Sequence, residues 1–206
     1  WKNIVFIDYD DEISSNAIEL HCKTLFDFDI SVGNLKIIDS GSKNTGNFFF
    51  DKLKLKKDIV KPNDIIFKNI FGMTNTAINR NALKKKTPLK NTNIIAYDWW
   101  MYTSLLDKGL KAKVIYDPVA NYRVKEKNTL GWGNEYNSRR FKNELNIIDS
   151  HFKLFETNKY RKIATNLITE AKGMTKKYDT LDKRKLTNNN VWYHDFFRNI
   201  LSLRSS

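Results

Sequence analysis

The stretch "VFIDYDDEIS", residues 5–14, constrains the fold more than any other part of this chain. An apolar run rich in β-branched residues ends abruptly in four acids, Asp8, Asp10, Asp11 and Glu12. This pattern is typical of a short buried strand that ends in a loop. The chain has a formal net charge of +13, so these acids gather against the overall charge and need a reason to be together.

The chain from residue 1 to about residue 131 alternates strand-like and helix-like patterns, which predicts an α/β domain. The expected extended segments are "KNIVFI" (2–7), "DISVGNLKIID", "NFFFDKLKLKK", "MTNTAIN" (73–79) and "KAKVIYDPVANYRV", the last with a turn at its proline. The expected helices are one capped by Ser14 or Ser15 and running to about Phe26, one near 81–85 and one over "YDWWMYTSLLDKG". On the first helix, Ala17, Ile18, Cys22 and Leu25 are expected to share one face.

The remainder of the chain has a different pattern. From about residue 135, apolar residues recur at helical spacing, for example Phe141, Leu145, Ile148 and Phe152, and glycine and proline nearly vanish. Residues 132–206 carry a net charge of +7, which makes them about twice as basic per residue as what precedes them. We therefore expect an α/β domain over 1–131 and a basic helical extension over 132–206.

Composition excludes several classes of protein. With 41% hydrophobic residues the 206-residue chain can build a real core, whereas its longest apolar runs fall far short of a membrane span. Its one cysteine, Cys22, allows neither an internal disulfide nor a site of clustered thiolates, which favours a reducing, intracellular compartment. A basic surface attracts nucleic acid, anionic lipid or phosphorylated substrates, and lysine-rich helices are also ordinary solvated faces.

The acidic stretch has three interpretations. A calcium loop of EF-hand spacing is one, but Ile13 stands where that loop needs glycine and a strand precedes it. A simple acidic turn that leads into the next helix is the second. The third is a divalent metal held at the carboxyl end of a strand, where Mg²⁺ or Mn²⁺ takes one or two carboxylates together with substrate phosphates.

Two downstream segments bear on that choice. "YDWW" places Asp98 at the start of a helix, and "NYRVKEKNTLG" places Arg123 and Lys125 on a loop after a strand. Each has an ordinary structural interpretation, since an acid can cap a helix and a cation can be solvated. Their order along the chain is what makes them informative.

The segments "FIDYDDEISSNAIE", "FGMTNTAINRNAL" and "AYDWWMYTSLLDKGLKAKVIYDPVANYRVKEKNTLG" resemble, in order and approximate spacing, the glycosyltransferase family 2 enzymes of GT-A fold. The resemblance covers about residues 2–131 and is strongest to the bacterial rhamnosyltransferase-like branch, in which a basic helical tail is also usual. It implies an incomplete GT-A fold followed by a helical C-terminal tail.

The resemblance also implies roles for individual residues. Asp8 and Asp10 match the Asp-x-Asp motif, which implies that Asp10 binds Mg²⁺ or Mn²⁺ and that Asp8 contacts the donor nucleotide. Asp98 matches the catalytic base, which takes the proton of the acceptor hydroxyl during an inverting transfer. The remaining matches are to donor-binding residues, Arg123 and Lys125, and to acceptor-binding residues, Asn75 and Thr76.

This sequence departs from the family pattern in two places. The branch commonly has His where this chain has Lys125, and a protonated lysine can pair with phosphate but cannot bind a metal. The family also begins with a strand-helix-strand portion that binds the nucleoside, whereas here the chain opens on the strand that leads to Asp8. We therefore expect a fragment that lacks part of the donor site and is by itself poorly active.

Together these features predict an inverting transferase that moves a sugar from a nucleoside-diphosphate sugar to a saccharide or lipid-linked acceptor in bacterial cell-surface polysaccharide synthesis. The expected location is the cytoplasm, with peripheral contact between the basic tail and the anionic inner face of the plasma membrane. Two alternatives stay open: a basic nucleic-acid-binding module and a non-catalytic glycosyltransferase fragment. No nucleic-acid motif occurs in the sequence, so no nucleic-acid partner is expected.

Overall fold

A computed structural model describes residues 1–53, 55–85, 94–124, 138–153, 158–178 and 196. Within these ranges the protein is a mixed α/β structure, which confirms the predicted class. The strands are β1 (Asn3–Val5), β2 (Glu12–Ile13), β3 (Ile30–Ile38), β4 (Asn44–Phe48), β5 (Ile59–Val60), β6 (Thr76–Asn79) and β7 (Ala112–Arg123). The helices are α1 (Ala17–Thr24), α2 (Phe49–Leu53), α3 (Pro62–Ile65), α4 (Arg80–Lys85), α5 (Tyr97–Asp107), α6 (Ser138–Lys153) and α7 (Asn158–Tyr178).

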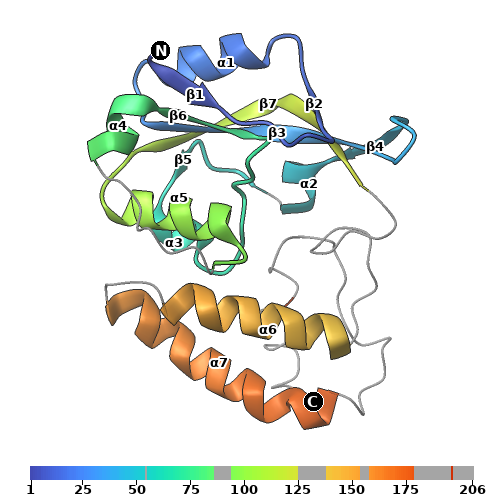
Figure 1. The fold of residues 1–206 in the computed structure, drawn as a ribbon, viewed down its shortest axis with the longest axis vertical. Helices are drawn as coiled ribbons and strands as arrows, with labels where there is room; N and C mark the ends of the chain where they lie inside the picture. The colour runs from blue at the N-terminus through green and yellow to red at the C-terminus, as the bar shows by residue number, and fades with distance from the viewer. Residues whose placement is uncertain (54, 86–93, 125–137, 154–157, 179–195, 197–206) are drawn as a thin grey trace.

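The strands form one mixed sheet in the order β1-β6-β3-β7-β2, with β4 paired to β3 and β5 paired to β7 (Figure 1). β3 and β7 are parallel, whereas β6 is antiparallel to both β1 and β3. It follows that β1, β3 and β7 all point the same way. β3 is buried along nearly its whole length, as its run of apolar residues requires of a strand covered on both faces.

β7 differs from the expected pair of short strands around a proline turn. It is one strand of 12 residues whose register against β3 shifts between Ile115, opposite Gly33, and Pro118, opposite Asn34. Proline cannot donate a ladder hydrogen bond, so it is accommodated in a bulge rather than in a turn. A Cβ atom at Gly33 would lie 2.3 Å from the side chain of Val119, so glycine is required where the two strands approach.

Helix α1 covers one face of the sheet, and α2, α3 and α5 lie on the other (Figure 1). The predicted serine cap is wrong, because the helix begins at Ala17 with Asn16 at its N-cap. The predicted face is also partly wrong: Ala17 and Leu25 are buried, but Ile18 and Cys22 are exposed. The buried face instead includes His21, whose Nδ1 lies 2.8 Å from Ser31 Oγ, and this hydrogen bond allows a polar ring to face the sheet.

The segment "NFFFDKLKLKK" is not extended throughout, contrary to the prediction. β4 ends at Phe48, and the next five residues form α2, which buries Phe49, Phe50 and Leu53. The carboxamide oxygen of Asn34 accepts the backbone N–H of Phe50 at 2.9 Å, which ties the start of this helix to β3. Apolar residues at these positions bury better in a helical turn than in a strand that alternates faces.

Helix α5 confirms the helix predicted over "YDWWMYTSLLDKG". Seven of its eleven residues are buried, among them Trp99 and Trp100, and Gly109 follows it with a φ of +89°. Such a positive φ is tolerated best by glycine, which ends the helix after Lys108. A helix buried on nearly all sides must be packed between two layers.

Helices α6 and α7 form the second of these layers, on the far side of α5 from the sheet (Figure 1). The ring of Trp99 on α5 stacks on that of His151 on α6, with 3.7 Å between centroids. The predicted boundary between residues 131 and 132 lies outside the described residues. One apolar core nevertheless includes side chains from both predicted domains, from Ile30 to Ala171. No described helix is long and apolar enough to cross a membrane.

Candidate active site

A cavity of about 320 Å³ opens at the edge of the sheet where β1, β3 and β7 have their carboxyl ends. We call it the acid cavity, because Asp8, which follows β1, and Asp98, in the first turn of α5, both line it. The residues lining it are Asp8, Leu35, Asn69, Gly72, Met73, Thr74, Asn75, Ile95, Ala96, Tyr97, Asp98 and Tyr122. Open α/β sheets place their ligands at this edge.

Asp98 has the most perturbed carboxyl group of the acid cavity. Its Oδ1 accepts the backbone N–H of Trp99 at 2.7 Å, and its Oδ2 accepts Nδ2 of Asn69 at 3.3 Å. Burial raises the pKa of Asp98 to about 6, and the negative charge of Asp8 adds to this rise against the two hydrogen bonds. A carboxylate with such a pKa can accept a proton near neutral pH.

The acidic turn, residues 8–12, contributes Asp8 to the lining of the acid cavity and is organised by Thr74. The Thr74 hydroxyl accepts the backbone N–H of Asp8 at 3.0 Å. As a donor it lies 3.1 Å from Asp8 Oδ2 and 2.5 Å from Asp11 Oδ2. Burial raises the pKa of Asp11, and the charges of Asp10 and Asp8 raise it further. The carboxylates of the turn therefore repel one another in the structure, as their spacing in sequence suggests.

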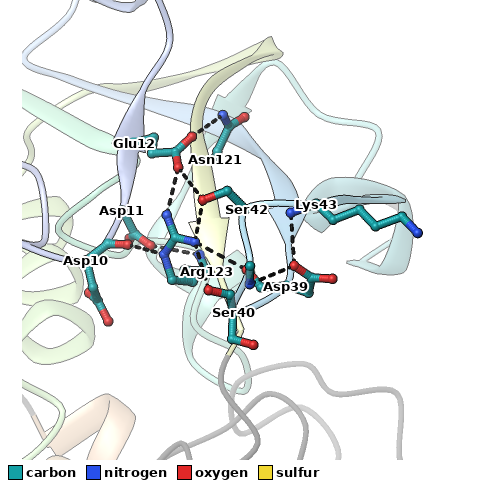
Figure 2. A network of polar contacts seen from close by, with 10 residues as sticks. Asp10, Asp11, Glu12, Asp39, Ser40, Ser42, Lys43, Asn121 and Arg123 are labelled. Atoms are coloured by element: carbon teal, nitrogen blue, oxygen red, sulfur yellow. Dashed lines mark hydrogen bonds and ion pairs between the residues drawn. The ribbon is translucent and has the colours of Figure 1, made fainter.

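Arg123, the last residue of β7, holds the acidic turn from the other side (Figure 2). Its backbone N–H donates to Asp11 Oδ1 at 2.8 Å. The guanidinium group donates to the Asp10 carbonyl oxygen (2.8 Å), Glu12 Oε1 (2.7 Å) and Ser42 Oγ (2.8 Å), and less closely to the carbonyl oxygens of Asp39 (3.3 Å) and Ser40 (3.4 Å). Hydrogen bonds from Asn121, Ser42 and Arg123 lower the pKa of Glu12. Arg123 thus clamps together the turn after β1, the turn after β3 and its own strand.

This clamp bears on the two predicted donor-binding cations. The Arg123 guanidinium is directed at protein oxygens rather than into the acid cavity, and Arg123 is not among the residues that line that cavity. Lys125 lies outside the described residues. Of the predicted donor-binding side chains, the structure therefore places Asp8 in the acid cavity and Arg123 behind it.

Asp10 was predicted to bind a metal. Its carbonyl oxygen faces Arg123, whereas its carboxylate points away from the guanidinium (Figure 2). Within the described ranges, no three His, Cys, Asp or Glu side chains form a group that could hold a metal ion. Mg²⁺ commonly takes only one or two protein carboxylates, and those of Asp8 and Asp10 supply the hard oxygen atoms that it prefers. The donor set at this turn therefore fits such an ion, provided that a ligand completes the coordination.

The predicted acceptor-binding residues, Asn75 and Thr76, are both fully buried. The carboxamide of Asn75 donates to the carbonyl oxygens of Gly33 and Ile70 and accepts the backbone N–H of Gly72 at 2.7 Å. Thr76 donates to Asn75 Oδ1 at 3.2 Å. The two side chains support the wall of the acid cavity, and contact of either with an acceptor stays a prediction.

Three residues that the sequence did not single out stand out in the structure. Thr74 bridges two acids, Asn69 donates to Asp98, and Tyr122 lines the acid cavity with a phenol whose pKa is raised by burial and by four surrounding acids, beginning with Asp11. Thr74 lies one position before the predicted Asn75, so its segment was identified but not its role. Tyr122 belongs to the segment that matches the family pattern, but no role was predicted for it, and Asn69 carries no periodic or motif signal that could have indicated it.

Comparison with known proteins provides no further assignment. No protein-family model matches this chain, and no curated protein matches it either.

Proposed function

We propose that this chain belongs to an inverting, nucleotide-sugar-dependent glycosyltransferase of family 2 with a GT-A fold, close to the rhamnosyltransferase-like branch. One observation carries the proposal: Asp98, a carboxylate with a pKa of about 6, lines the same cavity as Asp8, at the carboxyl ends of parallel strands. An inverting transfer needs two acidic groups with different tasks on either side of the reacting carbon. The acid cavity offers that arrangement.

In the proposed reaction Asp98 is the general base. An acceptor hydroxyl oxygen forms a bond to the anomeric carbon while the bond from that carbon to the donor diphosphate breaks, and the hydroxyl proton passes to a carboxylate oxygen of Asp98. The electron pair of the broken bond leaves with the nucleoside diphosphate. The hydrogen bonds from Asn69 and the Trp99 backbone orient the carboxylate for this transfer.

The acidic turn serves the donor side. A bound Mg²⁺ or Mn²⁺, held by Asp10 with Asp8 beside it, would neutralise charge on the leaving diphosphate. Arg123 acts here as a positioning residue, because it fixes the Asp10 backbone and the Asp11 carboxylate. Lys125 follows it closely in sequence and is the proposed direct cation for the donor phosphates.

The proposed setting is bacterial cell-surface polysaccharide synthesis at the cytoplasmic face of the plasma membrane, with a saccharide or lipid-linked acceptor. The net charge of +13 supports peripheral attraction to anionic lipid. The mixed sheet, with the acid cavity at the carboxyl ends of its parallel strands, supports the GT-A assignment.

The decisive experiment compares the wild type with Asp98→Asn in transfer from nucleoside-diphosphate sugars to saccharide acceptors, expressed with any natural sequence that flanks the chain. Loss of the base should reduce transfer about 10²- to 10⁴-fold, while calorimetric binding of the nucleoside diphosphate stays unchanged. Transfer by Asp98→Asn at the wild-type rate would refute the assignment of the base.

A second variant tests the donor side separately. Nucleoside-diphosphate affinity of the wild type should rise when Mn²⁺ or Mg²⁺ is added, and Asp10→Ala should lose that response while retaining the fold by circular dichroism. If neither ion changes the nucleoside-diphosphate affinity of the wild type, Asp10 is excluded as a metal ligand. That result would not bear on the role of Asp98.

A further inference from the structure

A second cavity, of about 430 Å³, lies on the other side of the chain segment that carries Asn69. Three lysines, Lys56, Lys57 and Lys68, line it, so we call it the lysine cavity. The other residues lining it are Leu55, Asn63, Asp64 and Phe67. They come from the segment between α2 and β5 and from α3 with the residues that follow it. None of the predicted site residues belongs to this cavity.

The charges of the lysine cavity do not balance. Its single described acid, Asp64, already contacts Lys57 through Oδ1 and accepts the backbone N–H of Lys61 through Oδ2 at 3.0 Å. These contacts lower the pKa of Asp64 although burial opposes them. One carboxylate thus stands among three lysines that line the cavity, and it already accepts a backbone N–H at the start of α3.

Lys68 is the least solvated of the three lysines. It is half-buried, and burial lowers its pKa, as does the positive charge of Lys57, while Asp64 opposes both. A half-buried ammonium beside a second lysine is costly unless an anion joins them. The wall beside the cations is apolar, from Leu55 and Phe67, which suits an organic group attached to that anion.

Adjacent residues of one chain segment line the lysine cavity and the acid cavity. Lys68 lines the first, and the next residue, Asn69, lines the second and donates to Asp98 Oδ2. Lys68 and Asn69 are adjacent in the chain, so one short backbone segment connects the lysine cavity to the residue that donates to the proposed base. The same segment is anchored to α5, since the indole N–H of Trp99 donates to the carbonyl oxygen of Ile65 at 2.6 Å.

We propose that the lysine cavity binds a phosphate or diphosphate ester, with Lys57 and Lys68 as its direct partners. The identification of this ester with the phosphate of the acceptor rests on the proposed function. It then explains how an acceptor is held with its hydroxyl near Asp98 and its phosphate away from the repelling acids of residues 8–12. Binding of the ester itself does not depend on the transfer reaction.

The test measures binding of inorganic diphosphate by calorimetry, in a chelating buffer that removes divalent cations from the acidic turn. Lys68→Gln and Lys57→Gln should each weaken the affinity at least about tenfold, because each removes a charge-assisted hydrogen bond. Lys108→Gln, the same charge change at an exposed position after α5, is the matched control and should change it less than about twofold. Unchanged affinity in Lys68→Gln would overturn the proposal.

Two further measurements separate the outcomes. Asp98→Asn should bind diphosphate as the wild type does. Binding at the lysine cavity is thereby tested separately from the glycosyltransferase assignment. Binding to phosphatidylglycerol vesicles and to soluble glycerol 3-phosphate then identifies the source of the phosphate. Vesicle binding that Lys68→Gln reduces, with no binding of glycerol 3-phosphate, assigns the site to a lipid headgroup; binding of both probes assigns it to a free phosphate ester.

Discussion

Asp98 and Glu12 carry the same chemical group at the two ends of one site, but their surroundings act on them in opposite directions. Burial raises the pKa of Asp98 to about 6 against the hydrogen bonds that it accepts, whereas Glu12 accepts from Asn121, Ser42 and Arg123, which lower its pKa. The first group is prepared to take up a proton and the second to stay charged and hold a turn. Environment, rather than residue type, separates the two roles.

Removal of the Arg123 clamp is expected to have the largest effect on stability. Arg123→Ala removes the guanidinium that donates to the Glu12 carboxylate and to the Asp10 carbonyl oxygen, and we expect the free energy of unfolding to fall by about 3 kcal/mol. Urea denaturation measures this loss. Arg123→Lys should recover little of it, because an ammonium cannot reproduce the planar fork of donors.

Glu12→Gln is the control for that variant. The Glu12 side chain is 44% exposed, so solvent screens its ion pair with Arg123 and Glu12→Gln should cost less stability than Arg123→Ala. If Arg123→Ala costs no more than Glu12→Gln, the backbone contacts of Arg123 do not hold the turn.

The pH dependence of stability tests the raised pKa of Asp98. The pKa of Asp98 in the folded protein, about 6, lies above its ordinary value of 3.8, so between these values the native state binds more protons than the unfolded state. The free energy of unfolding should therefore fall, by about 2 kcal/mol, as pH rises from about 4 to above 6. Transfer should rise over the same range, since a base must be deprotonated to act.

Asp98→Asn should lack this contribution. The stability of the variant relative to the wild type is expected to increase between pH 4 and pH 8, as followed by thermal or urea denaturation across that range. Parallel pH profiles for the two proteins would show that burial does not raise the pKa of Asp98.

The smallest expected effect is at Thr74, which sits between the two regions. Thr74→Val removes the hydroxyl that Asp8 and Asp11 share, and should cost about 1 kcal/mol and raise the pKa of Asp11 further. NMR titration of the carboxyl carbons measures that pKa. Thr74→Ser keeps the hydroxyl and should behave as the wild type; a serine variant as impaired as the valine variant would assign the effect to packing.

Local pattern was a sound guide where one face or one run of residues decides the structure. A strand before the acids, the apolar β3 and helix α5 follow from their sequences, as does the glycine that ends α5, although the strand before the acids is half-buried rather than buried. The local sequence pattern gave a wrong prediction where a contact between residues distant in sequence determines the structure. Ser31 turns His21 of α1 inward, and the carboxamide of Asn34 helps to begin α2 where a strand was expected.

The candidate site divides in the same way. Asp8, Asp10 and Asp98 could be singled out because acids after a strand and at a helix start are visible in the sequence. Thr74 and Asn69 could not, because their importance lies in partners that are 66 and 29 residues away. The use of Arg123 as a clamp rather than an open cation likewise depends on Ser42 and Glu12, which no local window contains.

By itself the sequence determined the mixed α/β class, the net charge of +13 and the presence of a dense acidic turn after a short strand. Only the tertiary structure decided which acids share a cavity, which acid has a raised pKa and where the lysines of residues 56–68 converge. The physical reason is that composition and periodicity act over a few residues, whereas desolvation and charge pairing depend on groups that folding brings together from distant parts of the chain.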